Sequence, residues 1–199
     1  MATNNDWGSA YTRTYQQAAE SAGIVVTEVI RLPEVDNNDL RTPLAKLRQA
    51  APDAILTSIN NADNINFVTR YRELGLSSAM LMHENFGDGV NTERISNDAA
   101  SDFYFFEYAD PTETFVSTYV DQHGEHPQIA ADTAYDAVHV LAQALAVGGV
   151  SREGVRAGLQ SVAEYHGASG LIDFTETNYP EDKKAVLRQV TTNSVINVE

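Results

Sequence analysis

Short apolar runs alternate with segments of helical periodicity along the first hundred residues. Apolar runs of strand-like composition lie at residues 24–30, 54–59 and 79–82. Each follows a segment whose apolar residues recur at helical spacing, and Gly23 and Gly75 stand where two of these helices would end. Helices that alternate with strands are typical of a parallel sheet covered by helices. The pattern therefore predicts an α/β fold with a doubly wound parallel sheet.

The pattern changes beyond the first hundred residues. A further strand is predicted at residues 103–106, and from 112 to about 162 the apolar spacing is almost purely helical. Strand character returns at 169–174, and the runs 186–190 and 195–198 are placed to pair across the polar turn between them. The second half of the chain therefore predicts a block of helices followed by strands.

These segments divide the chain into two parts. We expect residues 1–107 and 165–199 to form an α/β domain and residues 108–164 to form a helical segment. The stretch 87–91, rich in Gly, Asp and Asn, is expected to be a loop.

Charge and composition exclude several classes of function. The 28 acidic and 13 basic residues leave a formal net charge of -15, which repels phosphate backbones and disfavours nucleic acid as a partner. The chain has no cysteine, so it forms neither a disulfide nor a thiolate metal site. His123 and His126 flank Glu125 next to Pro127, a pattern that we interpret as a solvated turn. We therefore expect no metal site and no cofactor.

The amino-terminal residues lack the features of a targeting segment. Met1 leads into a polar run at residues 2–6, without the basic and apolar regions of a signal peptide. No stretch approaches the ~20 apolar residues that a membrane-spanning helix needs. We expect this chain to carry no signal peptide; if its parent protein is exported, the signal lies in sequence that has been removed.

A set of short motifs follows in a fixed order along nearly the whole chain, at residues 4–8, 23, 39–47, 52–55, 71–75, 84, 132–137 and 167–174. No single motif is specific. Their order and spacing together resemble the periplasmic leucine/isoleucine/valine-binding proteins and their amide- and urea-binding relatives, which are class I solute receptors of ABC transporters.

The resemblance implies a Rossmann-like receptor of two lobes, of which this chain is the carboxy-terminal part. Residues 1 to about 107 and 165–199 would belong to the second lobe, and the helices of 111–162 would pack on a first lobe that this sequence lacks. The strand expected just before Ala2 is also missing. The implied function, which is not enzymatic, is binding of a small amino-acid-like solute for ABC-type uptake in the periplasm or outside the cell. The implied partner of the parent protein is the transporter permease.

Candidate ligand-binding residues follow from the rule that doubly wound sheets bind ligands at the carboxyl ends of their strands. The positions that qualify lie at the entry of the first helix and directly after two strands: Trp7, Asn60, Asn61, Glu84, Asn85 and Phe86. The resemblance assigns the ligand's α-ammonium to Glu84 and an aromatic contact to Trp7, with Asn85 and Phe86 as neighbours of Glu84.

Each of these residues also has a structural interpretation. Trp7 would anchor its helix, Asn60 and Asn61 would cap a helix or hold a turn, and Glu84 would be a solvated loop acid. For the two asparagines we favour the structural role, and for Glu84 the ligand contact. At the level of function, the alternative is a ligand-sensing regulatory domain for amides or urea on the same fold. A flavodoxin-like enzyme ranks third and predicts cofactor absorbance or turnover.

The missing lobe has two expected consequences. Solute binding by this chain alone should be weak, in the ~mM range, because half of the binding site is absent. The helical segment should also expose an apolar face, which would be covered by self-association or by refolding onto the residual sheet. The residues of that face are Phe115, Tyr119, Leu141 and Leu145.

Overall fold

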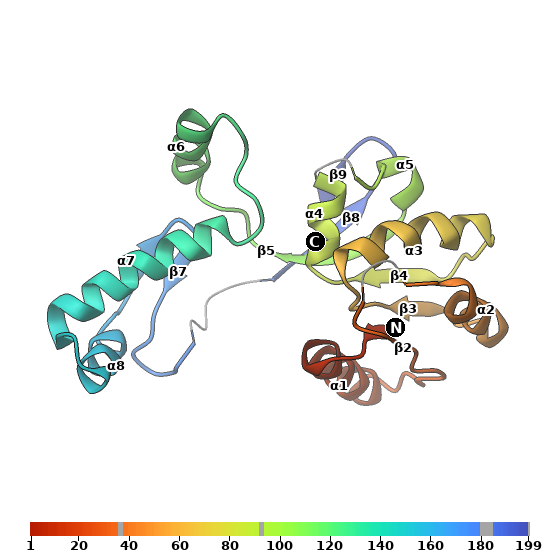
Figure 1. Ribbon diagram of the computed structural model, residues 1–199, viewed down its shortest axis with the longest axis horizontal. Coiled ribbons are helices and arrows are strands. Elements are labelled where there is room, and N and C mark those ends of the chain that lie inside the picture. The colour runs from red at the N-terminus through yellow and green to blue at the C-terminus, as the bar shows by residue number, and fades with distance from the viewer. Residues whose placement is uncertain (36–37, 92–93, 180–184, 199) are drawn as a thin grey trace. The chain divides into compact units, whose positions relative to one another are not determined.

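The computed structural model describes residues 1–35, 38–91, 94–179 and 185–198, which form two units (Figure 1). Unit 1 comprises Met1–Glu107 and Val186–Glu199, and unit 2 comprises Tyr108–Ala185. The first boundary coincides with the change of pattern seen in the sequence. The chain returns to unit 1 at Val186, whereas we expected the return at residue 165.

The main sheet of unit 1 has the strand order β3-β4-β5-β8-β9. The strands span Ala54–Leu56 (β3), Ala79–Met82 (β4), Phe103–Tyr108 (β5), Ala185–Val190 (β8) and Val195–Asn197 (β9). β3, β4 and β5 are parallel neighbours, whereas β8 and β9 form an antiparallel hairpin. A separate parallel pair joins β1 (Ala2–Thr3) to β2 (Arg31–Leu32). The predicted parallel-rich α/β sheet is therefore confirmed.

Five helices connect the described strands of unit 1. They are α1 (Asp6–Ser21), α2 (Arg41–Ala50), α3 (Asn61–Glu73), α4 (Asn85–Asn91) and α5 (Asn97–Ala100). Side chains from these helices and the strands form one hydrophobic core, which includes Leu44, Phe67, Met80, Phe103 and Phe105. Burial of each such side chain contributes about 1.5–3 kcal/mol, so unit 1 has an apolar core of its own.

Two local predictions in unit 1 were wrong. The expected strand at 24–30 is not formed: only β2 is regular, and Ile24 and Val25 remain 63% and 81% exposed. A strand needs a hydrogen-bonded neighbour, and a groove of about 280 Å³ lies between this segment and β3. The stretch 87–91, expected as a loop, lies within α4. Gly87 permits this helix to pack closely, because a Cβ there would lie 2.7 Å from the Phe105 ring.

The described residues of unit 2, 108–179 and 185, contain three helices and a hairpin. The helices are α6 (Glu113–His123), α7 (Ala131–Gly148) and α8 (Arg152–Gln160), as the spacing predicted, and the hairpin pairs β6 (Tyr165–Gly167) with β7 (Gly170–Ile172). Gly158 lets α8 approach α7, because a Cβ at this position would lie 2.1 Å from the Ala144 carbonyl oxygen.

The hairpin explains why residues 165–185 belong to unit 2. The Asp136 carboxylate of α7 accepts hydrogen bonds from the backbone N–H groups of Ala168 and Ser169, at 2.7 Å each. The strand expected at 169–174 therefore pairs locally with β6 and lies outside the main sheet. Across the described ranges, no helix has the length and apolar character needed to cross a membrane.

Candidate functional site

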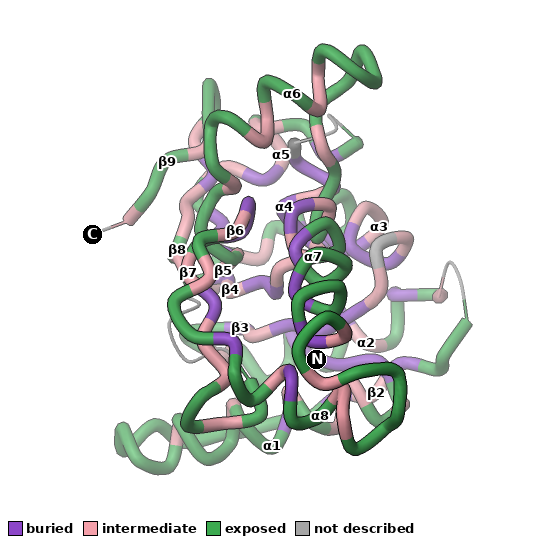
Figure 2. Tube along the Cα trace, turned by 90° about the vertical axis from the view of Figure 1, so that its left-hand side faces the viewer, coloured by how far each residue is buried: buried purple, intermediate pink, exposed green. Residues whose placement is uncertain are grey.

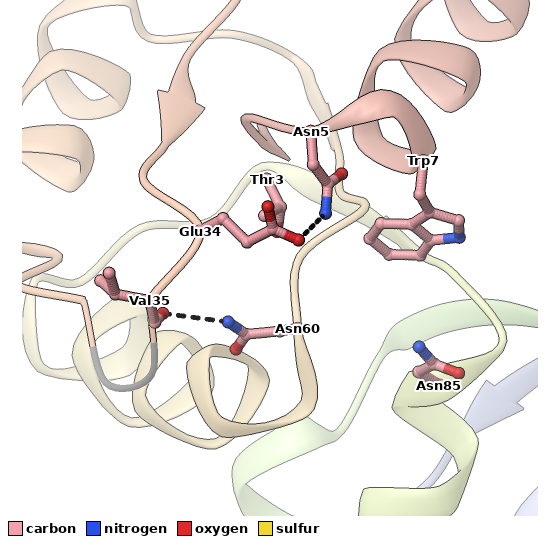
Figure 3. A pocket seen from close by; sticks show the side chains of 7 residues that line it. All are labelled: Thr3, Asn5, Trp7, Glu34, Val35, Asn60 and Asn85. Carbon is pink, nitrogen blue, oxygen red and sulfur yellow. Dashed lines mark hydrogen bonds between the residues drawn. The ribbon is translucent and has the colours of Figure 1, made fainter.

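A cavity of about 630 Å³ opens in unit 1 where several strands end (Figure 3). Its lining residues are Thr3, Asn5, Trp7, Glu34, Val35, Asn60 and Asn85. These residues end or follow β1, β2, β3 and β4. Three of the predicted ligand-binding residues, Trp7, Asn60 and Asn85, therefore line one cavity at the carboxyl ends of the strands, where the fold class places its ligands.

Asparagines cap two of the helices that begin at this cavity. Asn5 Oδ1 accepts a hydrogen bond from the Gly8 backbone N–H at 2.9 Å, and Asn60 Oδ1 accepts one from the Asp63 N–H at 2.8 Å. Each asparagine thus satisfies a backbone donor in the first turn of its helix, α1 or α3. The structural role favoured for Asn60 is present, and the same side chain also lines the cavity.

The amide groups of the two caps hold the loop between them. Asn5 Nδ2 donates to Glu34 Oε1 at 2.6 Å, and Asn60 Nδ2 donates to the Val35 carbonyl at 3.2 Å. Figure 3 shows both bonds and the Glu34 and Val35 side chains at the edge of the cavity. The loop after β2 is therefore fixed to the starts of both α1 and α3.

Trp7 belongs to an aromatic group beside the cavity. Its ring meets Tyr11 and His83 edge to face, with ring centroids 5.2 and 5.0 Å apart. Such contacts hold the indole in place, as the anchoring interpretation requires, while part of it lines the cavity. Tyr11 also stacks on Phe106 at 6.1 Å.

His83 links the ends of two strands in the uncharged form. Its Nε2 donates to the Ile59 carbonyl at 2.5 Å, and its Nδ1 accepts from the Asn85 backbone N–H at 3.2 Å. Burial lowers the pKa of His83, although the nearby Glu84 carboxylate acts in the opposite direction. A neutral ring with its proton on Nε2 fits both hydrogen bonds. His83 therefore positions the chain around Asn85, a role that the sequence did not reveal.

Glu84 lies beside the cavity, and its carboxylate is already engaged. Its Oε2 accepts a hydrogen bond from the Tyr11 hydroxyl at 2.7 Å, and its side chain is 19% exposed. Burial, followed by the charge of Glu84, raises the pKa of Tyr15 nearby. Glu84 is absent from the residues that line the cavity. Its contact with a ligand ammonium group is still a prediction.

The two other predicted residues do not line the cavity. Phe86 is 0% exposed and packs between Phe103 and Phe105, because α4 turns its side chain into the core. Phe86 was predicted to lie beside the ligand, but it is a core residue and does not line the cavity. Asn61 begins α3, and its side chain lies outside the described part of the structure.

The sequence missed four lining residues, Thr3, Asn5, Glu34 and Val35. Each ends or follows β1 or β2, two short strands that the sequence did not predict at their actual positions. The Thr3 Oγ1 atom is buried and has no hydrogen-bond partner among the described residues. It is therefore a buried polar atom whose hydrogen-bonding capacity the described residues leave unused. In the described part of the chain, no group of three His, Asp or Glu side chains is placed to hold a metal ion.

The chain belongs to the periplasmic binding protein family, whose model matches residues 1–194. Its fold is that of the substrate-binding proteins of ABC transporters. This is a family of binding proteins, which confirms the expectation that the chain is not an enzyme. No curated protein matches the chain.

Solved structures share the fold at low identity. A leucine-binding protein from Thermotoga maritima is 21% identical with a TM-score of 0.82, and the match covers 100% of this chain and 59% of that one. A branched-chain amino acid transporter substrate-binding protein from Streptococcus pneumoniae, in complex with isoleucine, is 19% identical with a TM-score of 0.74. That match covers 99% of this chain and 59% of the other. A solute-binding protein of an ABC transporter from R. palustris, in complex with benzoate, is 15% identical with a TM-score of 0.84, and the match covers 99% of this chain and 56% of the other. The chain thus spans less than two thirds of the length of these structures.

Proposed function

We propose that this chain binds a small amino-acid-like solute in the cavity at the strand ends, as part of a receptor for ABC-type uptake. The observation that carries the proposal is the meeting of Trp7, Asn60 and Asn85 in one cavity at the carboxyl ends of parallel strands. The parent protein would act in the periplasm or outside the cell and deliver its solute to a transporter permease. No cofactor is part of this proposal.

The chemistry of the lining supports a small solute with both apolar and polar parts. The Trp7 indole offers an apolar surface, and the amides of Asn60 and Asn85 are polar groups that can take part in hydrogen bonds. Relatives of the same fold are described as binding leucine and as complexed with isoleucine or benzoate, all small molecules with an apolar body and a polar group. Leucine and isoleucine are therefore the first solutes to test.

Trp7 is the single tryptophan of the chain, so its fluorescence reports on this cavity alone. Titration of the 199-residue chain with leucine should shift the Trp7 emission with a Kd in the ~mM range, because the chain spans only part of its relatives' length. An Asn85→Leu variant should lose the response. Gln17→Leu, on the exposed side of α1, is the matched control and should keep it. Absence of any response up to about 10 mM leucine or isoleucine would contradict the proposal.

A regulatory domain that senses amides or urea is the second candidate. It is favoured by the three asparagine side chains at the cavity, since neutral amides exchange paired hydrogen bonds with amide ligands. Acetamide and urea, titrated under the same conditions, separate the two functions. A stronger response to these amides than to leucine would favour sensing.

A further inference from the structure

We propose that Glu34 selects the charge of the ligand, so that this cavity accepts the ammonium end of a solute and disfavours its carboxylate. The inference rests on the proposed function and names the end of the solute that this half-site takes. It assigns the contact with the ligand's ammonium group to Glu34, in the loop after β2, in place of Glu84, to which the resemblance assigned it.

The first argument is the balance of charge at the cavity. Among the described residues that line the cavity, Glu34 alone has an ionisable side chain; the others are Thr3, Asn5, Trp7, Val35, Asn60 and Asn85. A carboxylate without a basic partner at the same surface attracts cations and repels anions. The overall charge of -15 acts in the same direction over a longer range.

The second argument is that Glu34 is held in position. Asn5 cannot turn its amide away without losing the cap of α1, because Oδ1 accepts from Gly8 while Nδ2 donates to Glu34 Oε1. Asn60 holds the next residue, Val35, through its carbonyl. The second oxygen, Oε2, has no hydrogen-bond partner among the described residues. A fixed carboxylate with one free oxygen is arranged to accept a further N–H donor.

The third argument concerns the helix ends. The amino-terminal ends of α1 and α3 attract negative charge, which would by itself favour a ligand carboxylate. At both ends, however, an asparagine oxygen already accepts a backbone N–H, and the carboxylate of Glu34 lies next to the cap of α1. At α1 the protein thus supplies the negative group that the helix end favours, and at α3 a neutral amide oxygen takes up one of the free N–H groups.

Glu84 is less suited to this role. It is absent from the residues that line the cavity, its side chain is only 19% exposed, and its Oε2 accepts from the Tyr11 hydroxyl. Glu34 belongs to the exposed residues, so a ligand reaches it without displacing a protein group. Because an exposed carboxylate is screened by water, we expect a moderate effect on affinity.

The test compares two probes with the carbon skeleton of leucine. 3-Methylbutylamine carries only the ammonium group, and 4-methylpentanoate carries only the carboxylate. Each is titrated into the full chain with Trp7 fluorescence as the readout. We expect the amine to bind more tightly, and Glu34→Gln to weaken the amine about three- to tenfold while the carboxylate binds equally or better. The difference should shrink in about 1 M salt.

Two variants control for charge and folding. Glu20→Gln removes the same charge from the exposed surface of α1, away from this cavity, and should leave the preference for the amine unchanged. Glu34→Asp keeps the charge and should keep the preference even where Glu34→Gln perturbs the loop. Circular dichroism and the Trp7 emission without probe verify that each variant is folded.

The outcomes separate this inference from the proposed function. If leucine binds but Glu34→Gln and Glu20→Gln change the amine affinity equally, the inference is wrong and the proposed function stands. The same holds if Glu84→Gln, and not Glu34→Gln, removes the preference. If neither the probes nor the amino acids alter the Trp7 emission, both proposals fail.

Discussion

The two units of this chain bury their apolar residues to very different extents. In unit 1 the strands β3, β4 and β5 and the helices beside them share one large core, whereas the buried apolar cluster of unit 2 consists of Val140, Val162 and Ile172. α6 has no buried residue, and Val138 and Leu141 of α7 are 68% and 45% exposed. Figure 2 shows this contrast along the chain, with much of α6 and α7 in green.

Unit 1 and unit 2 both consist of helices and strands, but different interactions stabilise them. Unit 1 is held by apolar burial, which is the dominant favourable contribution to folding. Unit 2 depends more on specific contacts: the Asp136 carboxylate fixes the hairpin, and Gly158 permits close packing of α7 and α8.

Truncation of a core residue should destabilise unit 1 strongly. Phe67 is fully buried, and Phe67→Ala should lower the free energy of unfolding of unit 1 by about 3–5 kcal/mol, through lost burial and the cavity that results. Leu141→Ala, at an exposed site of unit 2, should cost less than about 1 kcal/mol. Urea unfolding followed by Trp7 emission reports on unit 1, and circular dichroism reports on both units. If both substitutions lower the unfolding free energy by similar amounts, the two units do not differ in their dependence on apolar burial.

The stability of unit 1 should fall as the pH is lowered from 8 to 5. Burial lowers the pKa of the Met1 amino group from 8.0 to about 5, and burial also lowers the pKa of His83. Both groups are bases whose pKa is lower in the folded state, so the unfolded chain binds more protons in this range. Each contribution is complete above the unfolded pKa and is lost as the pH falls towards the folded pKa. The combined loss should be about 1–4 kcal/mol.

Unit 2 should respond differently in this pH range. Its resolved shifts are a raised pKa at Tyr165, caused first by burial, and a lowered pKa at Asp173, caused first by its hydrogen bond with Thr175. Both groups titrate outside pH 5 to 8. Unfolding curves at several pH values check this, and acetylation of the amino terminus should remove most of the pH dependence of unit 1. A pH dependence that survives acetylation and His83→Gln would contradict the assignment.

The hairpin of unit 2 should depend on Asp136. Asp136→Asn replaces two charged acceptor oxygens with one neutral acceptor and one donor. One of the two backbone N–H groups, of Ala168 or Ser169, therefore loses its acceptor, and the other keeps only a neutral one. We expect a loss of about 1–3 kcal/mol in unit 2. Hydrogen exchange of these two amides should quicken, while unit 1 is unchanged. Asp121→Asn, an exposed change of the same charge on α6, should leave the exchange as it was.

The exposed face of unit 2 should promote self-association with little effect on stability. Of the four residues predicted for this face, Leu141 is exposed, while Phe115, Tyr119 and Leu145 are half-buried. A Val138→Ser, Leu141→Ser double variant should change the unfolding free energy of unit 2 by less than about 0.5 kcal/mol per site and lower the mass measured by light scattering. Gln143→Ser is the control on the same helix. If the 199-residue chain without substitutions is a monomer in light scattering, this prediction is wrong.

Part of the candidate site was predicted from the sequence. Trp7 was predicted from the entry of its helix, Asn60 from a strand end and Asn85 as a neighbour of Glu84, and all three line the cavity. Phe86 was predicted from the resemblance as a neighbour of Glu84, but α4 turns its side chain into the core. The close packing of Gly87 against β5, which permits this helix, is not visible in the composition of residues 87–91. Glu34 was missed because β2 is short and begins later than the apolar run suggested.

The sequence alone establishes the α/β class, most of the order of helices and strands, and the positions of Trp7 at a helix entry and of Asn60 and Asn85 after strands. These follow from periodicity and caps, which are local properties of the chain. The tertiary structure is needed to see that residues 24–29 form no strand, that the 165–172 hairpin joins α7, and that Glu34 is held by Asn5. Each of these depends on a partner distant in sequence, because a strand, a buried carboxylate and a fixed loop all need a hydrogen-bonding neighbour that local pattern does not specify.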